Sequence, residues 1–280
     1  MTPTTLTCFD VRYDGQVAHL QLNRPEQKNS LIPSFWAELR HLVEDIDRQA
    51  RARVIVLSST GKHFCTGLDL GVFEGGMFRA HGGGDEPGRK RALLYQGIRS
   101  LHETFLALQR SRIPLIAAVQ GGCVGGGVSL AAACDLRYAT RDAFFLLQEI
   151  NIAITPDVGQ LHWLSKVMPD ALVREMAYRG TRLPAGRAEQ VGFVNEVFED
   201  HGTLLDAVAG IANEIAQKSP LPVWGCKHMI NHARTHPVED GLDLVALWQA
   251  GMYHPNDTKE TLRARQEGRL AVYENLRPTP

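Results

Sequence analysis

Alternating polar and apolar residues at the start of the chain predict a β-hairpin. Residues 7–15 (TCFDVRYDG) and 16–24 (QVAHLQLNR) both alternate, and each run is short enough for one strand. Asp14 and Gly15 stand between them, a dipeptide that favours tight hairpin turns. We therefore expect two strands joined by a turn at this point.

Helical spacing follows the hairpin and then gives way to a continuous apolar run. Residues 30–50 repeat apolar side chains at the period of an amphipathic helix. Residues 53–59 (RVIVLSS) are apolar on both faces, as a buried strand is. The apolar positions of the helix are Phe35, Leu39, Leu42, Val43 and Ile46. Strand, helix and strand in succession indicate an α/β protein.

The middle of the chain continues the same pattern around a glycine-rich segment. Residues 71–90 contain seven glycines without a period and predict a loop. A helix is expected over residues 90–110 and a buried strand over 115–119. Two further strands are expected over 134–140 and 143–150.

The last 80 residues carry helical periods and no strand pattern. Residues 187–198 predict a helix, a turn at Gly192 and a short strand, after which apolar residues recur only at helical spacing. We expect a core over residues 1–200 and an all-helical C-terminal region over 201–280.

Composition and charge narrow the functional classes. The 280 residues carry a formal net charge of -1, so no overall basic field favours nucleic acid or an anionic membrane. The N-terminal residues lack the pattern of a secretory signal, and no segment approaches the ~20 apolar residues that span a bilayer. We expect a soluble cytoplasmic protein.

Metal and disulfide chemistry find little support in the sequence. Five cysteines form no CxxC pair and are odd in number, which argues against a disulfide framework and a thiolate zinc site. His228 and His232 are four residues apart but lack the glutamate of a HExxH motif. We expect no metal site.

Two glycine-bearing segments each follow a buried strand. Residues 56–70 (VLSSTGKHFCTGLDL) and 117–135 (AAVQGGCVGGGVSLAAACD) are such segments. Glycine lets a backbone approach a ligand closely, and two such loops can supply the two N–H donors of an oxyanion hole. The alternative is that the glycines only allow tight packing of strand and helix. A phosphate loop of the form GxxxxGK[ST] is absent, and a dinucleotide fingerprint fits poorly.

Acidic residues beside apolar runs are the second chemical signal. Glu149 ends an apolar run, and Asp157 follows eight residues later. Burial raises the pKa of a carboxyl group and fits it for proton transfer near neutral pH. The alternatives are an ion pair for Glu149 and a helix N-cap for Asp157. Ser129 lies in an expected first helical turn, without the GxSxG pattern of a nucleophile.

The combined segments resemble the enoyl-CoA hydratase/isomerase family, the crotonase superfamily. The resemblance covers nearly the whole chain in four stretches: HLQLNRPEQKNSLIPSFWAEL, FCTGLDL, residues 113–164 and GTRLPAGRAEQVGFVNEVF. It implies a ββα-spiral core with a C-terminal helical trimerisation region. It also implies trimers or dimers of trimers, acyl-CoA substrates of fatty acid β-oxidation, and no cofactor beyond the coenzyme A of the substrate.

The resemblance also implies roles for single residues. The backbone N–H groups of Leu68 and Gly126 would bind the thioester carbonyl, and Lys28 and Lys62 are candidates to bind the phosphates of coenzyme A. Hydratases of the family carry two glutamates. The second matches Glu149, whereas the first falls on Ser129, which counts against ordinary two-glutamate hydration.

One branch, the Δ3,5-Δ2,4-dienoyl-CoA isomerases, is more similar. Its strand-end glutamate and the aspartate eight residues on match Glu149 and Asp157, and the FWAEL and DTKETLRARQEGR segments also match. Members of this branch have an aspartate where this chain has Ser129, which leaves Ser129 an auxiliary role in orienting Glu149 or a water. We therefore expect a 1,5-proton shift on a dienoyl-CoA. A hydratase, a Δ3,Δ2-isomerase, a thioester hydrolase and a non-catalytic acyl-CoA-binding protein remain alternatives.

Overall fold

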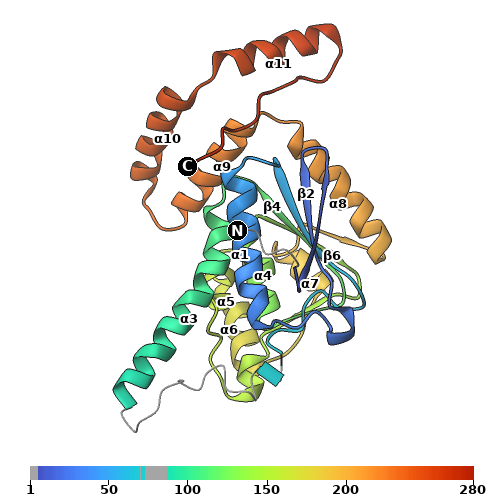
Figure 1. The fold of residues 1–280 in the computed structure, drawn as a ribbon, viewed down its shortest axis with the longest axis vertical. Coiled ribbons are helices and arrows are strands. Elements are labelled where there is room, and N and C mark those ends of the chain that lie inside the picture. The colour runs from blue at the N-terminus through green and yellow to red at the C-terminus, as the bar shows by residue number, and fades with distance from the viewer. Residues whose placement is uncertain (1–5, 70, 73–86) are drawn as a thin grey trace.

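A six-stranded sheet forms the centre of the molecule (Figure 1). The computed structural model describes residues 6–69, 71–72 and 87–280. The strand order is β1-β2-β3-β4-β6-β9, and every neighbouring pair is parallel except the antiparallel hairpin of β1 and β2. The strands are β1 (Phe9–Asp14), β2 (Val17–Leu22), β3 (Val54–Ser59), β4 (Leu115–Val119), β6 (Leu136–Thr140) and β9 (Glu196–Phe198). The predicted hairpin and buried strands are thus confirmed.

A second, three-stranded sheet has the order β5-β7-β8. It consists of β5 (Gly122–Val124), β7 (Phe144–Leu146) and β8 (Leu183–Pro184). The pairing of β5 with β7 is parallel, and that of β7 with β8 is antiparallel. A three-residue strand inside a glycine run has no alternation, so the sequence did not reveal β5.

Alternate residues of the large sheet pack into two apolar cores. In β3, Ile55 and Leu57 join the core that includes α1 (Pro33–Arg48), α3 (Pro87–Arg110) and α4 (Gly126–Ala133). Val54 and Val56 face the other way, against α8 (His201–Ala216). Figure 1 shows α8 on one side of the sheet and α1, α3 and α4 on the other. Helices on both faces explain why the strands are apolar on both sides.

Shorter helices connect the strands around the site. They are η1 (Pro25–Gln27), η2 (Glu149–Ile152), α5 (Gln160–Leu164), α6 (Asp170–Arg179) and α7 (Ala185–Gln190). The strand expected over 143–150 ends at residue 146, because Gln148 already adopts a right-handed helical conformation before η2. The loop expected over 71–90 falls mostly outside the described residues, and its residues 87–90 belong to α3 instead.

The C-terminal region is helical, as its periods predict. After α8 come α9 (Pro220–Ala233), α10 (Val238–Met252) and α11 (Pro255–Glu267). Helices α9 and α10 pack through Trp224 and Trp248, whose ring centroids lie 4.8 Å apart at an edge-to-face angle of 86°. Helix α8 packs on the sheet, and the expected division between residues 200 and 201 remains a prediction.

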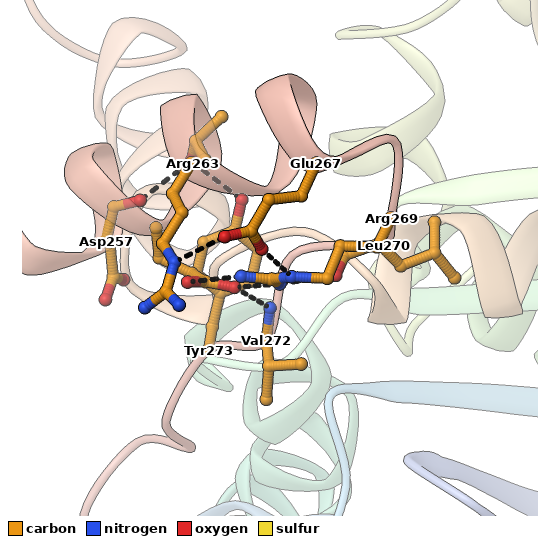
Figure 2. A network of polar contacts seen from close by, with 9 residues as sticks. Asp257, Arg263, Glu267, Arg269, Leu270, Val272 and Tyr273 are labelled. Atoms are coloured by element: carbon orange, nitrogen blue, oxygen red, sulfur yellow. Dashed lines mark hydrogen bonds and ion pairs between the residues drawn. The ribbon is translucent and has the colours of Figure 1, made fainter.

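Beyond α11 the chain reverses and returns to the core as a C-terminal strap, residues 268–280. At the turn, Arg269 forms ion pairs with both Glu260 and Glu267, and Figure 2 shows the pair with Glu267. Further along, Arg53 at the start of β3 donates to the carbonyl of Tyr273 and to Oδ1 of Asn275. The strap is therefore fixed both to α11 and to the edge of the core.

Candidate active site

A cavity of about 600 Å³ opens where the two glycine-bearing segments meet η1, η2 and the loop before α5. Five of the residues singled out from the sequence line it: Lys28, Leu68, Gly126, Glu149 and Asp157. Apolar side chains that include Leu31, Trp36, Leu101, Ile152, Ile154 and Val158 complete the wall. An apolar cavity with a few polar groups is typical of a small-molecule site.

Backbone hydrogen bonds hold the two glycine-bearing segments side by side. The N–H of Val124 donates to the carbonyl of Cys65 at 2.9 Å, within a parallel bridge between Cys65 and Cys123. On the other side, the N–H of Leu31 donates to the carbonyl of Gly67 at 2.8 Å. Residues 56–70 thus pair with backbone on both sides, and this pairing fixes the position of Leu68 in the cavity wall.

Glycine is required at two positions because of how closely the segments approach. Gly67 has a φ of +83°, and a Cβ there would lie 3.0 Å from the carbonyl oxygen of Val124. Gly125 has a φ of +54° and a ψ of -121°, and a Cβ there would lie 3.0 Å from Oε1 of Glu149. These backbone conformations are accessible mainly to glycine. Close backbone approach, rather than helix packing alone, accounts for the glycines.

Two backbone donors in the cavity wall lack a protein acceptor. Within the described part of the chain, no hydrogen bond uses the N–H of Leu68 or that of Gly126. Gly126 is the first residue of α4, where unpaired N–H groups and the helix dipole favour negative charge. Such a pair of donors can stabilise an oxygen that becomes negative during a reaction.

Glu149 and Asp157 have raised pKa values. Burial raises the pKa of Glu149 to about 7, and the neighbouring charge of Asp157 adds to the rise. Burial also raises the pKa of Asp157, which the charge of His102 opposes. Glu149 can therefore exchange a proton near neutral pH, and the protonated form of Asp157 is more accessible than that of an exposed aspartate.

A third carboxylate in the wall, Asp69, has the opposite character. Its Oδ2 accepts from the hydroxyl of Ser30 at 2.7 Å, and its Oδ1 accepts from the N–H of Gly71 at 3.0 Å. The Ser30 hydrogen bond is the main cause that lowers the pKa of Asp69. Asp69 therefore stays ionised at neutral pH, in contrast to the two carboxyl groups with raised pKa values.

The structure excludes the structural alternatives for the two acids. Helix α5 begins at Gln160 with Gly159 as its N-cap, so Asp157 is not a capping residue. Among the ion pairs of the described residues, none involves Glu149. The pattern placed Glu149 at the end of a strand, whereas it lies at the start of η2, three residues after the end of β7.

Ser129 and Lys62 lie away from the described cavity wall. Ser129 is fully buried in α4, and its Oγ has no hydrogen-bond partner among the described residues. Lys62 is exposed, as is Lys28, but only Lys28 lines the cavity. The roles of these three residues remain predictions.

Two residues near the acids had not been singled out from the sequence. Nε2 of Gln160 donates to Oε1 of Glu149 at 2.7 Å. Nε2 of His102, on α3, lies 2.6 Å from the carbonyl oxygen of Asp157. Gln160 follows Asp157 by three residues, a proximity that could have drawn attention to it. His102 is 55 residues away in sequence, and no local pattern points to it.

The site offers no sign of a metal centre in the residues described. No group of three His, Cys, Asp or Glu side chains in residues 6–69, 71–72 and 87–280 is arranged to hold an ion. Among the described residues, no helix combines the length and apolarity that crossing a bilayer requires.

The chain belongs to the enoyl-CoA hydratase/isomerase family, whose model matches residues 12–276. It is thus an enzyme of this family, which removes support from a purely binding role. The fold agrees with that of solved members. An enoyl-CoA hydratase from Bacillus anthracis superposes with a TM-score of 0.84 and 29% identity, covering 95% of this chain and 99% of that one.

Curated relatives favour an isomerase. The peroxisomal Delta(3,5)-Delta(2,4)-dienoyl-CoA isomerase of Arabidopsis thaliana is 37% identical over 272 residues, 97% of this chain and 98% of the relative. The mitochondrial enzyme of the same name from Mus musculus is 36% identical over 254 residues, 90% of this chain and 77% of the relative.

Proposed function

We propose that this enzyme converts a 3,5-dienoyl-CoA into the conjugated 2,4-dienoyl-CoA by a 1,5-proton shift. The observation that carries the proposal is the presence, in one cavity wall, of two acids with raised pKa values and two unpaired backbone donors. The names of the relatives support the same reaction class.

The thioester carbonyl oxygen is placed against the N–H groups of Leu68 and Gly126. Glu149, ionised, removes a proton from C2, and the electron pair moves into the thioester to give a dienolate. Asp157, protonated, delivers a proton to C6 as the double bonds shift to C2 and C4. One proton is taken up and one is released, so no oxidant, reductant or water is consumed.

The two carboxyl groups suit these steps because they differ in surroundings. The Glu149 pKa of about 7 lets its ionised form exist at neutral pH while the group still accepts a proton readily. The raised pKa of Asp157 makes the protonated form that C6 protonation needs less costly to reach than it is for an exposed aspartate. The dienolate charge is met by preorganised main-chain donors, each of which is typically worth ~3 kcal/mol of barrier.

Several further expectations belong to this proposal. Lys28 and Lys62 are proposed to contact the phosphates of coenzyme A, and Ser129 to support Glu149 or a water. A homotrimer or dimer of trimers is expected, and so is an enzyme that needs no cofactor. The relatives' names refer to mitochondria and peroxisomes, and the cytoplasmic location expected for this chain remains a prediction.

Asp157→Asn tests the proposal most directly. The amide cannot give a proton to C6, so formation of the conjugated diene from 3,5-octadienoyl-CoA should fall by about 10²- to 10⁴-fold. Conversion is followed by the ultraviolet absorbance of the 2,4-diene. If the unsubstituted enzyme forms no diene but hydrates crotonyl-CoA, the proposal is wrong. If Asp157→Asn leaves diene formation intact, a reaction that uses Glu149 alone replaces it.

A further inference from the structure

We infer that Gln160 is a positioning residue for Glu149, which fixes the direction of the carboxylate through Oε1. The role of Glu149 as a proton acceptor rests on the function proposed above. The hydrogen bond from Gln160 to Glu149 is present without any substrate.

The amide of Gln160 has a single orientation. Its Oε1 accepts the backbone N–H of Val158 at 3.2 Å, so Nε2 is the end that points at Glu149. The side chain is fully buried and cannot exchange this contact for water. Gln160 therefore presents a donor at 2.7 Å from Oε1 of Glu149 whether or not substrate is bound.

The turn that places Gln160 depends on Gly159. Gly159 is the N-cap of α5, and its φ of +97° lies in the region that favours glycine. A Cβ at this position would meet the ring of Trp163 at 2.0 Å. The backbone conformation between Asp157 and α5 is thus set by packing, and Gln160 is held at the start of a short helix.

The second oxygen of Glu149 is in a different state. Oε2 is buried and has no hydrogen-bond partner among the described residues. A buried carboxylate oxygen without a partner is costly, which favours an arrangement in which a ligand or proton reaches it. Because no donor among the described residues reaches Oε2, the donor from Gln160 to Oε1 is the side-chain contact that orients this carboxylate.

The groups around the Glu149 carboxylate either favour or disfavour its ionised form. Burial, the largest influence, and the charge of Asp157 disfavour the ionised form of Glu149, whereas its own backbone N–H and the hydrogen bond from Gln160 stabilise that form. His102 on α3 contacts Asp157 rather than Glu149. Gly125 leaves room beside Oε1, because a Cβ there would lie only 3.0 Å from that oxygen. Gln160 is thus the side chain that favours the ionised carboxylate and sets its direction.

Gln160→Met tests this inference, because it keeps the length of the side chain and removes the donor. Loss of a hydrogen bond to a charged group predicts a kcat lower by about 10- to 100-fold, with KM for the dienoyl-CoA changed little. The acidic limb of the pH–kcat/KM profile should move to higher pH, because the ionised form of Glu149 loses its donor.

Gln109→Met is the matched control. Oε1 of Gln109 accepts from Nε1 of Trp163 at 3.1 Å, so this variant also removes a glutamine contact to α5 but leaves Glu149 untouched. It should lower thermal stability without moving the acidic limb. If Gln160→Met behaves in the same way, Gln160 is only structural and the inference is overturned.

A second variant keeps the inference testable if Gln160→Met does not fold. Gln160→Glu preserves the shape of the side chain but places a second carboxyl group against Oε1. Two adjacent carboxyl groups share a proton, so the acidic limb should move further up in pH. An unchanged limb in this variant contradicts the inference.

An infrared titration separates this inference from the proposed reaction. The carboxylic acid C=O band of Glu149 is assigned by its loss in Glu149→Gln and is followed against pH without substrate. If this band titrates at higher pH in Gln160→Met, positioning by Gln160 stands even where no dienoyl-CoA is isomerised. If the band titrates as in the unsubstituted enzyme, the inference falls although isomerisation is observed.

Discussion

Gly125→Ala should impair both folding and turnover, because position 125 combines an unusual backbone with a crowded neighbour. The φ of +54° and ψ of -121° lie in a region that side-chain-bearing residues rarely adopt. Holding alanine there costs on the order of 1–3 kcal/mol. For a protein of this size, each kcal/mol corresponds to about 2–4 °C in Tm, so we expect Tm to fall by roughly 2–12 °C.

The effect on turnover follows from the position of the added methyl group. A Cβ at residue 125 would lie 3.0 Å from Oε1 of Glu149, whereas ordinary contacts begin at 3.4 Å and extend to 4 Å. The carboxylate must therefore retreat by a few tenths of an ångström, and Gln160 restrains that retreat on the other side. Since a misplacement of about 1 Å can cost about 100-fold in rate, a shift of a few tenths of an ångström predicts a loss of up to about 10-fold.

Differential scanning fluorimetry and the diene absorbance assay measure the two effects. Gly210→Ala is the control, because Gly210 is an exposed residue of α8 with open space around its Cβ position. It should keep full turnover and raise stability by about 0.5–1 kcal/mol. A Gly125→Ala variant with the Tm and turnover of the unsubstituted enzyme would refute the reasoning about this close approach.

Two further variants test stability. Since the folded-state pKa of Glu149 is raised from 4.5 to about 7, the stability associated with its protonated form is fully present below pH 4.5 and is lost as pH rises through about 7. Glu149→Gln should therefore raise Tm more at pH 8 than at pH 4, and an equal change at both would contradict the burial of this group. Lys227→Met should destabilise by about 3 kcal/mol, because the buried ammonium pairs with Asp135 at 2.9 Å and donates to two backbone carbonyls. The exposed Lys218→Met serves as its control, and equal Tm values for the two variants would contradict this ranking.

Much of the fold could be read from periodicity because most elements bury one face or both. Helix α1 repeats at helical spacing and the first four residues of β3 are apolar, and both elements form as predicted. Strand β5 escaped prediction because three residues in a glycine run show no period. The early end of β7 was not predicted because the apolar pattern continues beyond Leu146, whereas the helical conformation of Gln148 ends the strand.

The candidate site was foreseeable where chemistry follows local sequence and hidden where it depends on packing. Glu149 and Asp157 stand out as acids beside apolar runs, and both line the cavity. His102 reaches Asp157 from a helix distant in sequence, and Gln160 meets Glu149 only because Gly159 turns the chain. Contacts of this kind arise from tertiary structure, which single-sequence patterns do not encode.

The pairing of the two glycine-bearing segments has a consequence for redesign of this enzyme. The N–H groups of Leu68 and Gly126 belong to the main chain, and neighbouring backbone pairs fix them. Under the proposed function, substitutions at Glu149, Asp157 or Gln160 would change proton transfer while the proposed anchor for a thioester oxygen persists. Libraries that vary the acids and keep Gly67 and Gly125 should retain acyl-thioester binding across variants with different reactivity.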